Sequence, residues 1–383
     1  MNVRKFWTQL HWLLGISVGS LLLLIGLSGA VVAFREEVLQ ALNPATGRVV
    51  KRDTPLMTPD QLLHEWAEQR PGERVGTLTL YAEPELPARL VLEPRAGERR
   101  GDTLFVNPYT GLLLEERWGQ RFFEFTESLH RWLLLPREPG RVVTGLLAIG
   151  LLILSLSGLY LRWPRHWKDR RTWWHIDTRL RGRALWRRLH LVAGTACLVL
   201  YLALTTTGIF WAFDGVRDPV SAWLGEPRPA KAETPKKAGP KADGAGEVSL
   251  ATAWTSFGRA TSAEGWSEVI IRVPTQAKAP MLFTWLNRSP AHERARNRTT
   301  VNAATGEVMK DERFAAKPLG GKILAAIYPL HMGTLLGLPG RLAMLAAALI
   351  LPAFTITGWW LYLDRRKLKR AAEAKRQGLR ATA

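Results

Sequence analysis

Four histidines stand at matching positions in the two halves of this 383-residue sequence. His11 and His190 each open a long apolar stretch, and glycines follow each of them four and eighteen residues later. His130 and His331 come before two further apolar stretches. Imidazole is the commonest metal ligand, and two rings that face each other across an apolar gap suit an iron porphyrin with two axial ligands. The sequence therefore predicts two pairs of ligands to haem iron. A pseudo-twofold relation between the halves would pair His11 with His190 and His130 with His331, and pairing across non-equivalent helices stays an alternative.

Other metal centres fit these residues less well. Carboxylates are missing beside the histidines in the apolar stretches, and Cys197 is the single cysteine, so neither a four-ligand zinc site nor an iron–sulfur cluster is expected. A Cys-x-x-Cys-His sequence for covalent haem attachment is also missing. We therefore expect two b-type haems per chain. Each histidine taken alone could instead cap a helix or anchor it at the lipid headgroups.

The apolar stretches must position these histidines. Each is long enough to cross a bilayer, which takes about 20 residues. The four expected transmembrane helices cover roughly residues 13–34, 142–163, 191–213 and 342–363. Glycines within them could let a macrocycle approach the backbone, or could serve helix–helix packing.

The net charge of +20 is concentrated at the membrane flanks. Short basic loops stay in the cytoplasm, whereas long segments of mixed charge are exported. We therefore expect a multi-pass membrane protein with both termini cytoplasmic and two large domains outside. This placement of the charge, without a recognisable binding module, excludes a nucleic-acid role.

The expected fold class is an α-helical membrane protein whose four transmembrane helices form two parallel repeats, with two periplasmic α+β domains. The boundaries are 1–34 for the first transmembrane helix, 35–140 for the first periplasmic domain, 141–163 for the second helix, 164–189 for a basic cytoplasmic loop, 190–213 for the third helix, 214–340 for the second periplasmic domain with a linker at 226–246, 341–363 for the fourth helix and 364–383 for a basic cytoplasmic tail.

Each exported segment shows a helix followed by short strands. Thr58 and Pro59 suggest the N-cap and first residue of the first helix, which runs to Glu68. Strands are expected at 75–81, 88–93, 103–106 and 112–115, and in the second segment a helix at 250–260 precedes strands at 268–273, 281–286, 299–302 and 308–310.

An arginine follows each of the two histidines that precede an apolar stretch, His130 and His331. Arg141 and Arg341 each come directly after the glycine of a turn that we expect between the histidine and its transmembrane helix. Such arginines could pair with haem propionates, or extend toward lipid headgroups.

Together these motifs resemble the PepSY-associated transmembrane proteins. The resemblance rests on the Leu-His-x-x-x-Gly openings, the Ser-Leu-His-Arg-Trp sequence ending at Trp132, and turns such as Asn107-Pro108-Tyr109-Thr110-Gly111. Within that family the sequence is most similar to the inner-membrane ferric-siderophore reductases of the ferrioxamine type. The resemblance implies a location in the bacterial inner membrane, with the outer domains in the periplasm, and b-type haem held by His11, His130, His190 and His331. One departure is Pro-Leu-His-Met around His331, which leaves the histidine in place but changes its neighbours.

The leading functional hypothesis is an oxidoreductase that passes electrons across the membrane to a periplasmic ferric siderophore of the hydroxamate type and releases Fe(II). Its electron donor would be a quinol or a partner protein, because Gly-x-Gly-x-x-Gly is missing from the sequence. Two alternatives stay open: a membrane-anchored PepSY scaffold for interaction or regulation, and a transporter of haem or siderophore.

Overall fold

The computed structural model describes residues 2–95, 101–164, 166, 168–226, 250–274 and 279–381. The predicted linker 226–246 lies outside the described residues except for Glu226. The chain divides into two compact units, which we describe separately. Unit 1 contains residues 1–34, 122–219 and 327–383, and unit 2 contains residues 35–121 and 220–326.

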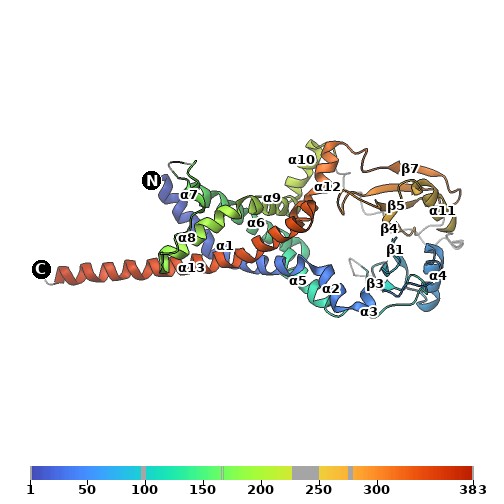
Figure 1. The fold of residues 1–383 in the computed structure, drawn as a ribbon, viewed down its shortest axis with the longest axis horizontal. Coiled ribbons are helices and arrows are strands. Elements are labelled where there is room, and N and C mark those ends of the chain that lie inside the picture. Colours follow the sequence, from blue (N-terminus) through green and yellow to red (C-terminus); the bar gives the residue numbers. More distant parts are fainter. Residues whose placement is uncertain are drawn as a thin grey trace. The chain divides into compact units, whose positions relative to one another are not determined.

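Helices and strands follow one another along the chain as labelled in Figure 1. In order they are α1 (Val3–Val32), α2 (Arg35–Leu42), α3 (Pro44–Gly47), α4 (Pro59–Gln69), β1 (Val75–Tyr81), β2 (Ala88–Leu92), β3 (Thr103–Val106), α5 (Gln120–Trp132), α6 (Arg137–Arg162), α7 (Arg170–Trp174), α8 (Gly182–Ala196), α9 (Leu198–Ala212), α10 (Asp214–Trp223), α11 (Leu250–Thr261), β4 (Trp266–Arg272), β5 (Met281–Asn287), β6 (Asn297–Val301), β7 (Val308–Glu312), α12 (Leu319–Met332), the 3₁₀ helix η1 (Thr334–Leu336) and α13 (Gly337–Ala381).

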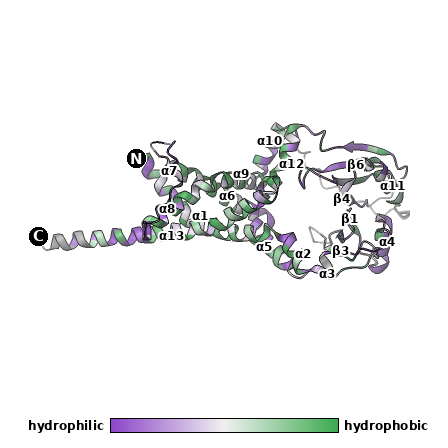
Figure 2. Cartoon of the chain, in the orientation of Figure 1, coloured by the Kyte–Doolittle hydropathy of each residue, from purple (hydrophilic) through white to green (hydrophobic). Residues whose placement is uncertain are grey.

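Unit 1 is a bundle of long apolar helices. α1 packs against α13 and α6, and α6 packs against α9. Its interior includes Leu22, Leu147, Tyr201 and Leu351, while apolar side chains such as Val199 stay exposed on the outside. Figure 2 shows the apolar colour continuing along these helices. An apolar exterior of this length is expected where lipid replaces water.

The third predicted transmembrane helix is broken in the structure. α1, α6 and α13 are each long and apolar enough to cross a membrane. α8 and α9 reach this length only together, as one span that is bent by 60°. The break falls at Cys197, whose N–H bonds to the carbonyls of both Ala193 and Thr195. Gly194 lies within the last turn of α8, and glycine lowers the stability of a helix interior. α13 is longer than expected, because the helix continues through the predicted tail.

The predicted Pro-Gly-Arg turns are wrong. Pro139, Gly140 and Arg141 lie in the first turns of α6. The chain instead turns just before, where Leu133 and Leu134 have φ values of 52° and 60°. Gly140 is needed for packing, since a Cβ there would come within 2.5 Å of the Trp132 carbonyl oxygen. The corresponding Gly340 likewise lies inside α13.

Unit 2 contains one antiparallel sheet built from both halves of the sequence. The strand order is β3-β2-β1-β4-β5-β6-β7 in the described part of the chain. We expected two separate domains; instead β1 pairs with β4 in the middle of the sheet, with Thr79 opposite Ile270. Unpaired strand edges are prone to association, and this pairing satisfies the edge of each half. The predicted strand 112–115 is wrong, because only an isolated bridge joins Leu113 to Val106.

A single hydrophobic core lies between the sheet and the helices α4 and α11. Trp66 of α4, Phe257 of α11, and Phe283 and Trp285 of β5 are all essentially buried. α4 begins with the predicted cap, in which the Thr58 hydroxyl accepts from Gln61 N and the Gln61 side chain accepts from Thr58 N. The core of unit 2 therefore joins segments more than 150 residues apart in the sequence.

Candidate functional site: two histidine pairs

The structure brings His11 and His190 together inside unit 1. His11 lies on α1 and His190 on α8, and the centres of their rings are 6.5 Å apart with an interplanar angle of 75°. Phe354 of α13 packs edge-on against the His190 ring, with ring centres 4.9 Å apart. Helices from both halves of the sequence therefore supply this pair.

His130 and His331 form a second pair with the same geometry. His130 lies near the end of α5 and His331 near the end of α12, and their ring centres are 6.4 Å apart at 67°. Ser28, which contacts His130, follows His11 by 17 residues on α1, which corresponds to about 25 Å along a helix axis. The two pairs therefore lie near opposite ends of the apolar helices.

A hydroxyl group lies against the Nδ1 atom of each histidine. The Nδ1–Oγ distance is 2.8 Å for His11 and Ser157, and 2.8 Å for His190 and Thr357. It is 2.7 Å for His331 and Thr207. His130 Nδ1 lies 3.4 Å from Ser28 Oγ and 3.0 Å from the Ile25 carbonyl oxygen.

These contacts decide which ring nitrogen carries the proton. The four hydroxyl groups donate to carbonyl oxygens one turn back in their own helices, as Thr207 does to Ala203 at 2.7 Å. A hydroxyl has one hydrogen to donate, so toward the histidine it acts as an acceptor. In a neutral ring Nδ1 therefore carries the hydrogen, and Nε2 keeps a lone pair. This is the arrangement by which proteins orient imidazole ligands toward a metal.

The four hydroxyl residues were not predicted from the sequence. A signal for them exists, since each is followed directly by glycine: Ser28-Gly29, Ser157-Gly158, Thr207-Gly208 and Thr357-Gly358. Each of the four apolar stretches thus contains a hydroxyl–glycine dipeptide whose hydroxyl contacts a histidine, and residues 142–163 also contain a second dipeptide, Thr144-Gly145. The glycine positions are evident from the sequence alone, whereas the link between the hydroxyl groups and the histidines requires the three-dimensional contacts.

Two of these glycines leave room for the imidazole rings. A Cβ on Gly29 would lie 2.9 Å from Cε1 of His130, and a Cβ on Gly158 would lie 3.3 Å from Cε1 of His11. The first distance is shorter than real Cβ contacts, so any larger residue at position 29 would displace the ring. The absence of a side chain at Gly29 therefore makes room for the His130 ring.

The residues present fit a haem iron with two axial ligands. A bond from an imidazole nitrogen to a metal is about 2 Å long, so ring centres 6.5 and 6.4 Å apart leave room for one iron between the two rings of each pair. Among the described residues no group of three or more His, Cys, Asp or Glu side chains could hold a metal ion, so a metal at these pairs needs ligands beyond protein side chains.

A cavity of about 1010 Å³ extends from the His11–His190 pair. Its walls are largely apolar and include Leu154, Leu198 and Phe354, and both histidines line it. This volume is at the upper end of the range usual for cofactor pockets. An apolar cavity lined by two oriented imidazoles is the environment that a porphyrin requires.

One comparison with known proteins matches nearly the whole chain. Residues 8–365 match the family described as the PepSY-associated TM region. The chain belongs to this family. Together with the apolar helices, membership makes it a multi-pass membrane protein. A search of curated proteins found no match to the sequence.

The two arginines predicted to bind propionates are engaged elsewhere in this PepSY-associated protein. Arg141 forms ion pairs with Glu138 at 3.0 Å and with Asp214 at 3.1 Å. Arg341 donates to the Ala33 carbonyl at 2.8 Å and lies over the ring of Phe34. Their role toward a haem stays a prediction.

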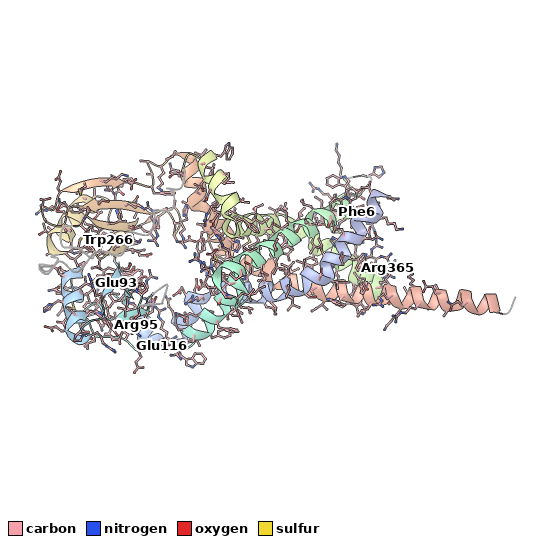
Figure 3. All side chains as sticks on the ribbon, turned by 180° about the vertical axis from the view of Figure 1, so that it is seen from behind. Phe6, Glu93, Arg95, Glu116, Trp266 and Arg365 are labelled. Carbon is pink, nitrogen blue, oxygen red and sulfur yellow. The ribbon has the colours of Figure 1, made fainter. Side chains whose placement is uncertain are left out.

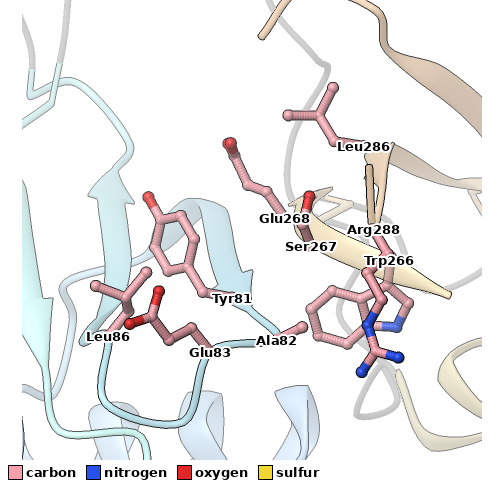
Figure 4. A pocket seen from close by; sticks show the side chains of 9 residues that line it. All are labelled: Tyr81, Ala82, Glu83, Leu86, Trp266, Ser267, Glu268, Leu286 and Arg288. Atoms are coloured by element: carbon pink, nitrogen blue, oxygen red, sulfur yellow. The ribbon is translucent and has the colours of Figure 1, made fainter. Parts of the chain in front are cut away.

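A second cavity, of about 420 Å³, lies in unit 2 where β1 pairs with β4. Tyr81 and Glu83 line it from the first half of the sequence, and Trp266, Glu268 and Arg288 from the second (Figure 4). Burial raises the pKa of the Tyr81 phenol, which therefore stays protonated and able to donate at neutral pH. The PepSY-associated chain thus has a polar and aromatic pocket outside its apolar helices.

Proposed function

We propose that this chain is a di-haem b oxidoreductase of the bacterial inner membrane that reduces ferric siderophores in the periplasm and releases Fe(II). His11 with His190, and His130 with His331, would hold one haem each. The observation that carries this proposal is the two pairs of neighbouring imidazoles, in which Nδ1 of each ring lies against a hydroxyl group and Nε2 has no hydrogen bond to any described residue. A purely structural scaffold has no need for four rings oriented in this way.

A haem held by two histidines exchanges one electron reversibly. The chain's own contribution is to hold two such centres near opposite ends of its apolar helices. A donor on the cytoplasmic side, a quinol or a partner protein, would supply one electron for each Fe(III) chelate. Hydroxamate oxygens are hard ligands that favour Fe(III) over Fe(II), so reduction weakens their hold on the metal.

The pocket at the β1–β4 junction supports docking of the chelate in unit 2. Its phenol and guanidinium can donate to hydroxamate oxygens, and the Trp266 ring offers an apolar face. In this proposal unit 2 is periplasmic, and the basic segments that flank the apolar helices are cytoplasmic.

The test is a haem count on the purified full-length protein and its four single His→Ala variants. We expect two b-type haems per chain in the original protein and loss of one haem in each variant, together with reduction of a ferric trihydroxamate. His64→Ala is the control, since His64 is exposed and pairs with Glu68 at 3.3 Å in unit 2. Full haem content in all four variants would refute the assignment.

The same preparation separates the alternatives. A scaffold predicts a colourless protein from haem-replete cells. A transporter predicts that labelled chelate or haem crosses the bilayer of proteoliposomes, whereas the reductase predicts that only electrons cross and that Fe(II) collects on the side of the chelate.

A further inference from the structure

The cavity at the His11–His190 pair opens among basic side chains. α1 contributes one, the end of α6 another, and α8 and α13 the others, against one carboxylate, Glu373. The basic residues that line the cavity are Arg4, Arg162, Arg183, Arg187, Arg365, Arg366, Lys369 and Arg370. Figure 3 labels Arg365 on α13, close to where this helix leaves the bundle.

Most of these basic residues already have partners within the protein. Arg4 donates to the Leu161 carbonyl at 3.2 Å, and Arg162 donates to the Thr172 carbonyl, also at 3.2 Å. Arg183 lies 3.5 Å from Asp364, and Lys369 lies 3.7 Å from Glu373. Arg366 lies over the Tyr362 ring.

Arg187, Arg365 and Arg370 are different. All three side chains are exposed, line the cavity and have no polar or aromatic partner among the described residues. Arg370 lies five residues beyond Arg365 on α13, about 7.5 Å farther along the helix from Thr357, so Arg187 and Arg365 are the two nearer to the His190 ring. Arg187 precedes His190 by three residues on α8, which places both on one helix face. On α13, Arg365 follows Thr357, the hydrogen-bond partner of His190, by eight residues, or about 12 Å of helix. The two arginines therefore reach the mouth from the two helices that position the His190 ring.

The first half of the sequence offers no matching pair in the described residues. The position three residues before His11 is Thr8, whose hydroxyl donates to the Arg4 carbonyl at 2.8 Å. The position eight residues after Ser157 is residue 165, which lies outside the described residues. Among the residues that the structure describes, the unpartnered cationic groups that line this cavity therefore come from α8 and α13.

We propose that Arg187 and Arg365 bind the two propionates of the haem held by His11 and His190, and thereby set its orientation and raise its midpoint potential. This inference rests on the proposed function. Guanidinium groups match carboxylates with two parallel hydrogen bonds, and two of them suit the two propionates of b-type haem. Ferric haem carries one more positive charge than ferrous haem, so cations that neutralise the propionates favour the ferrous form.

The test uses Arg187→Gln and Arg365→Gln in the full-length protein, with Lys367→Gln as the matched control. Lys367 carries the same charge on α13 but does not line the cavity. Equilibrium redox titration followed by haem absorbance gives one wave per haem, and the wave lost in His11→Ala belongs to this site. We expect each arginine variant to lower the midpoint potential of that wave alone, and to speed transfer of haem to apomyoglobin.

The control should leave both waves in place, and Arg187→Lys should restore part of the shift. Unchanged waves in both arginine variants, or an equal shift in Lys367→Gln, would overturn the proposal that Arg187 and Arg365 bind the propionates. It would also be overturned if the arginine variants lost bound anionic lipid while their haem spectra and potentials stayed the same. A purified protein without any haem would refute the proposed function itself. Arginine variants with two haems and unshifted waves would refute only the binding of propionates by Arg187 and Arg365.

Discussion

At the scale of single residues, the hydroxyl partners of the histidines matter as much as the imidazoles. Each hydroxyl uses its hydrogen on a helix carbonyl and so accepts the Nδ1 hydrogen of the neighbouring ring. The side chain thereby fixes both the tautomer and the rotation of the ring. Removal of one hydroxyl should therefore weaken metal binding without removing a ligand.

Thr207 and Thr206 allow a direct test of this expectation. The Thr207 hydroxyl contacts His331, whereas the Thr206 hydroxyl bonds only to carbonyls of its own helix, Leu202 at 2.7 Å and Ala203 at 3.2 Å. We expect Thr207→Val to reduce haem affinity at the His130–His331 site by about 10–100-fold. Thr206→Val, the same change one residue away, should leave it unaltered. Haem affinity can be measured by titration of the haem-free protein, and equal losses in both variants would contradict the prediction.

At the scale of elements, the sharp connection before α6 stores backbone strain. Leu133 and Leu134 both adopt left-handed conformations, which L-residues avoid. In the second half of the sequence the connection before α13 instead uses Gly333 and Gly337, with φ values of 77° and 63°. Leu133 packs against the interior of unit 1, whereas Leu134 is about half exposed (48%). Strain at Leu134 is therefore weakly compensated.

Leu134→Gly should stabilise unit 1 modestly. Left-handed backbone costs an L-residue about 1–2 kcal/mol, whereas the extra conformational entropy of glycine costs roughly 0.5–1 kcal/mol. We expect the free energy of unfolding to rise by up to about 1 kcal/mol. Leu135, similarly exposed but without a positive φ, supplies the control, since Leu135→Gly should lower stability. Thermal unfolding in detergent distinguishes the two, and a lower midpoint for Leu134→Gly would disprove the strain.

The sequence predicted elements well where local signals were strong. β1 and β3 have the expected bounds, and the cap at Thr58 is as predicted, because alternation and capping are local. The sequence-based prediction failed where contacts between distant residues determine the structure. The Pro-Gly-Arg segments looked like turns but lie inside helices, because Gly140 packs against the Trp132 backbone. The pairing of β1 with β4 could not be foreseen either, since no local pattern specifies a partner about 190 residues away.

For the histidines, the matched spacing of the two halves predicted the pairs that the structure brings together. It did not reveal the hydroxyl groups, since serine and threonine are common in apolar helices and only the three-dimensional contacts give them meaning. It also directed attention to Arg141 and Arg341, because sequence position cannot show that Glu138 and Asp214 already hold Arg141.

At the scale of the molecule, the two halves depend on each other. In unit 2 the Asp60 carboxylate of α4 accepts from the N–H groups of Leu250 and Ala251, at 2.7 and 3.0 Å. Those residues begin α11, so an acid from the first half caps a helix of the second. A carboxylate at a helix N-terminus satisfies free N–H groups and the helix dipole together.

Asp60→Ala should therefore destabilise unit 2 as a whole. The expected loss is about 1 kcal/mol, within the range of roughly 0.5–2 kcal/mol for removal of such a cap. Asp53→Ala is the matched control, because Asp53 is exposed and caps no helix. Urea unfolding followed by tryptophan fluorescence measures both. An Asp60 variant as stable as the control would show that the cap contributes little.

Each imidazole pair takes one ring from each half, and the pairing of β1 with β4 joins the strands of the two halves into one sheet. A polypeptide of only one half would thus carry one histidine of each pair and could complete neither pair alone. It could complete both only by forming a homodimer. The present chain therefore has the geometry of a dimer tethered into one molecule, whose two halves can differ at equivalent positions, as Thr8 and Arg187 do.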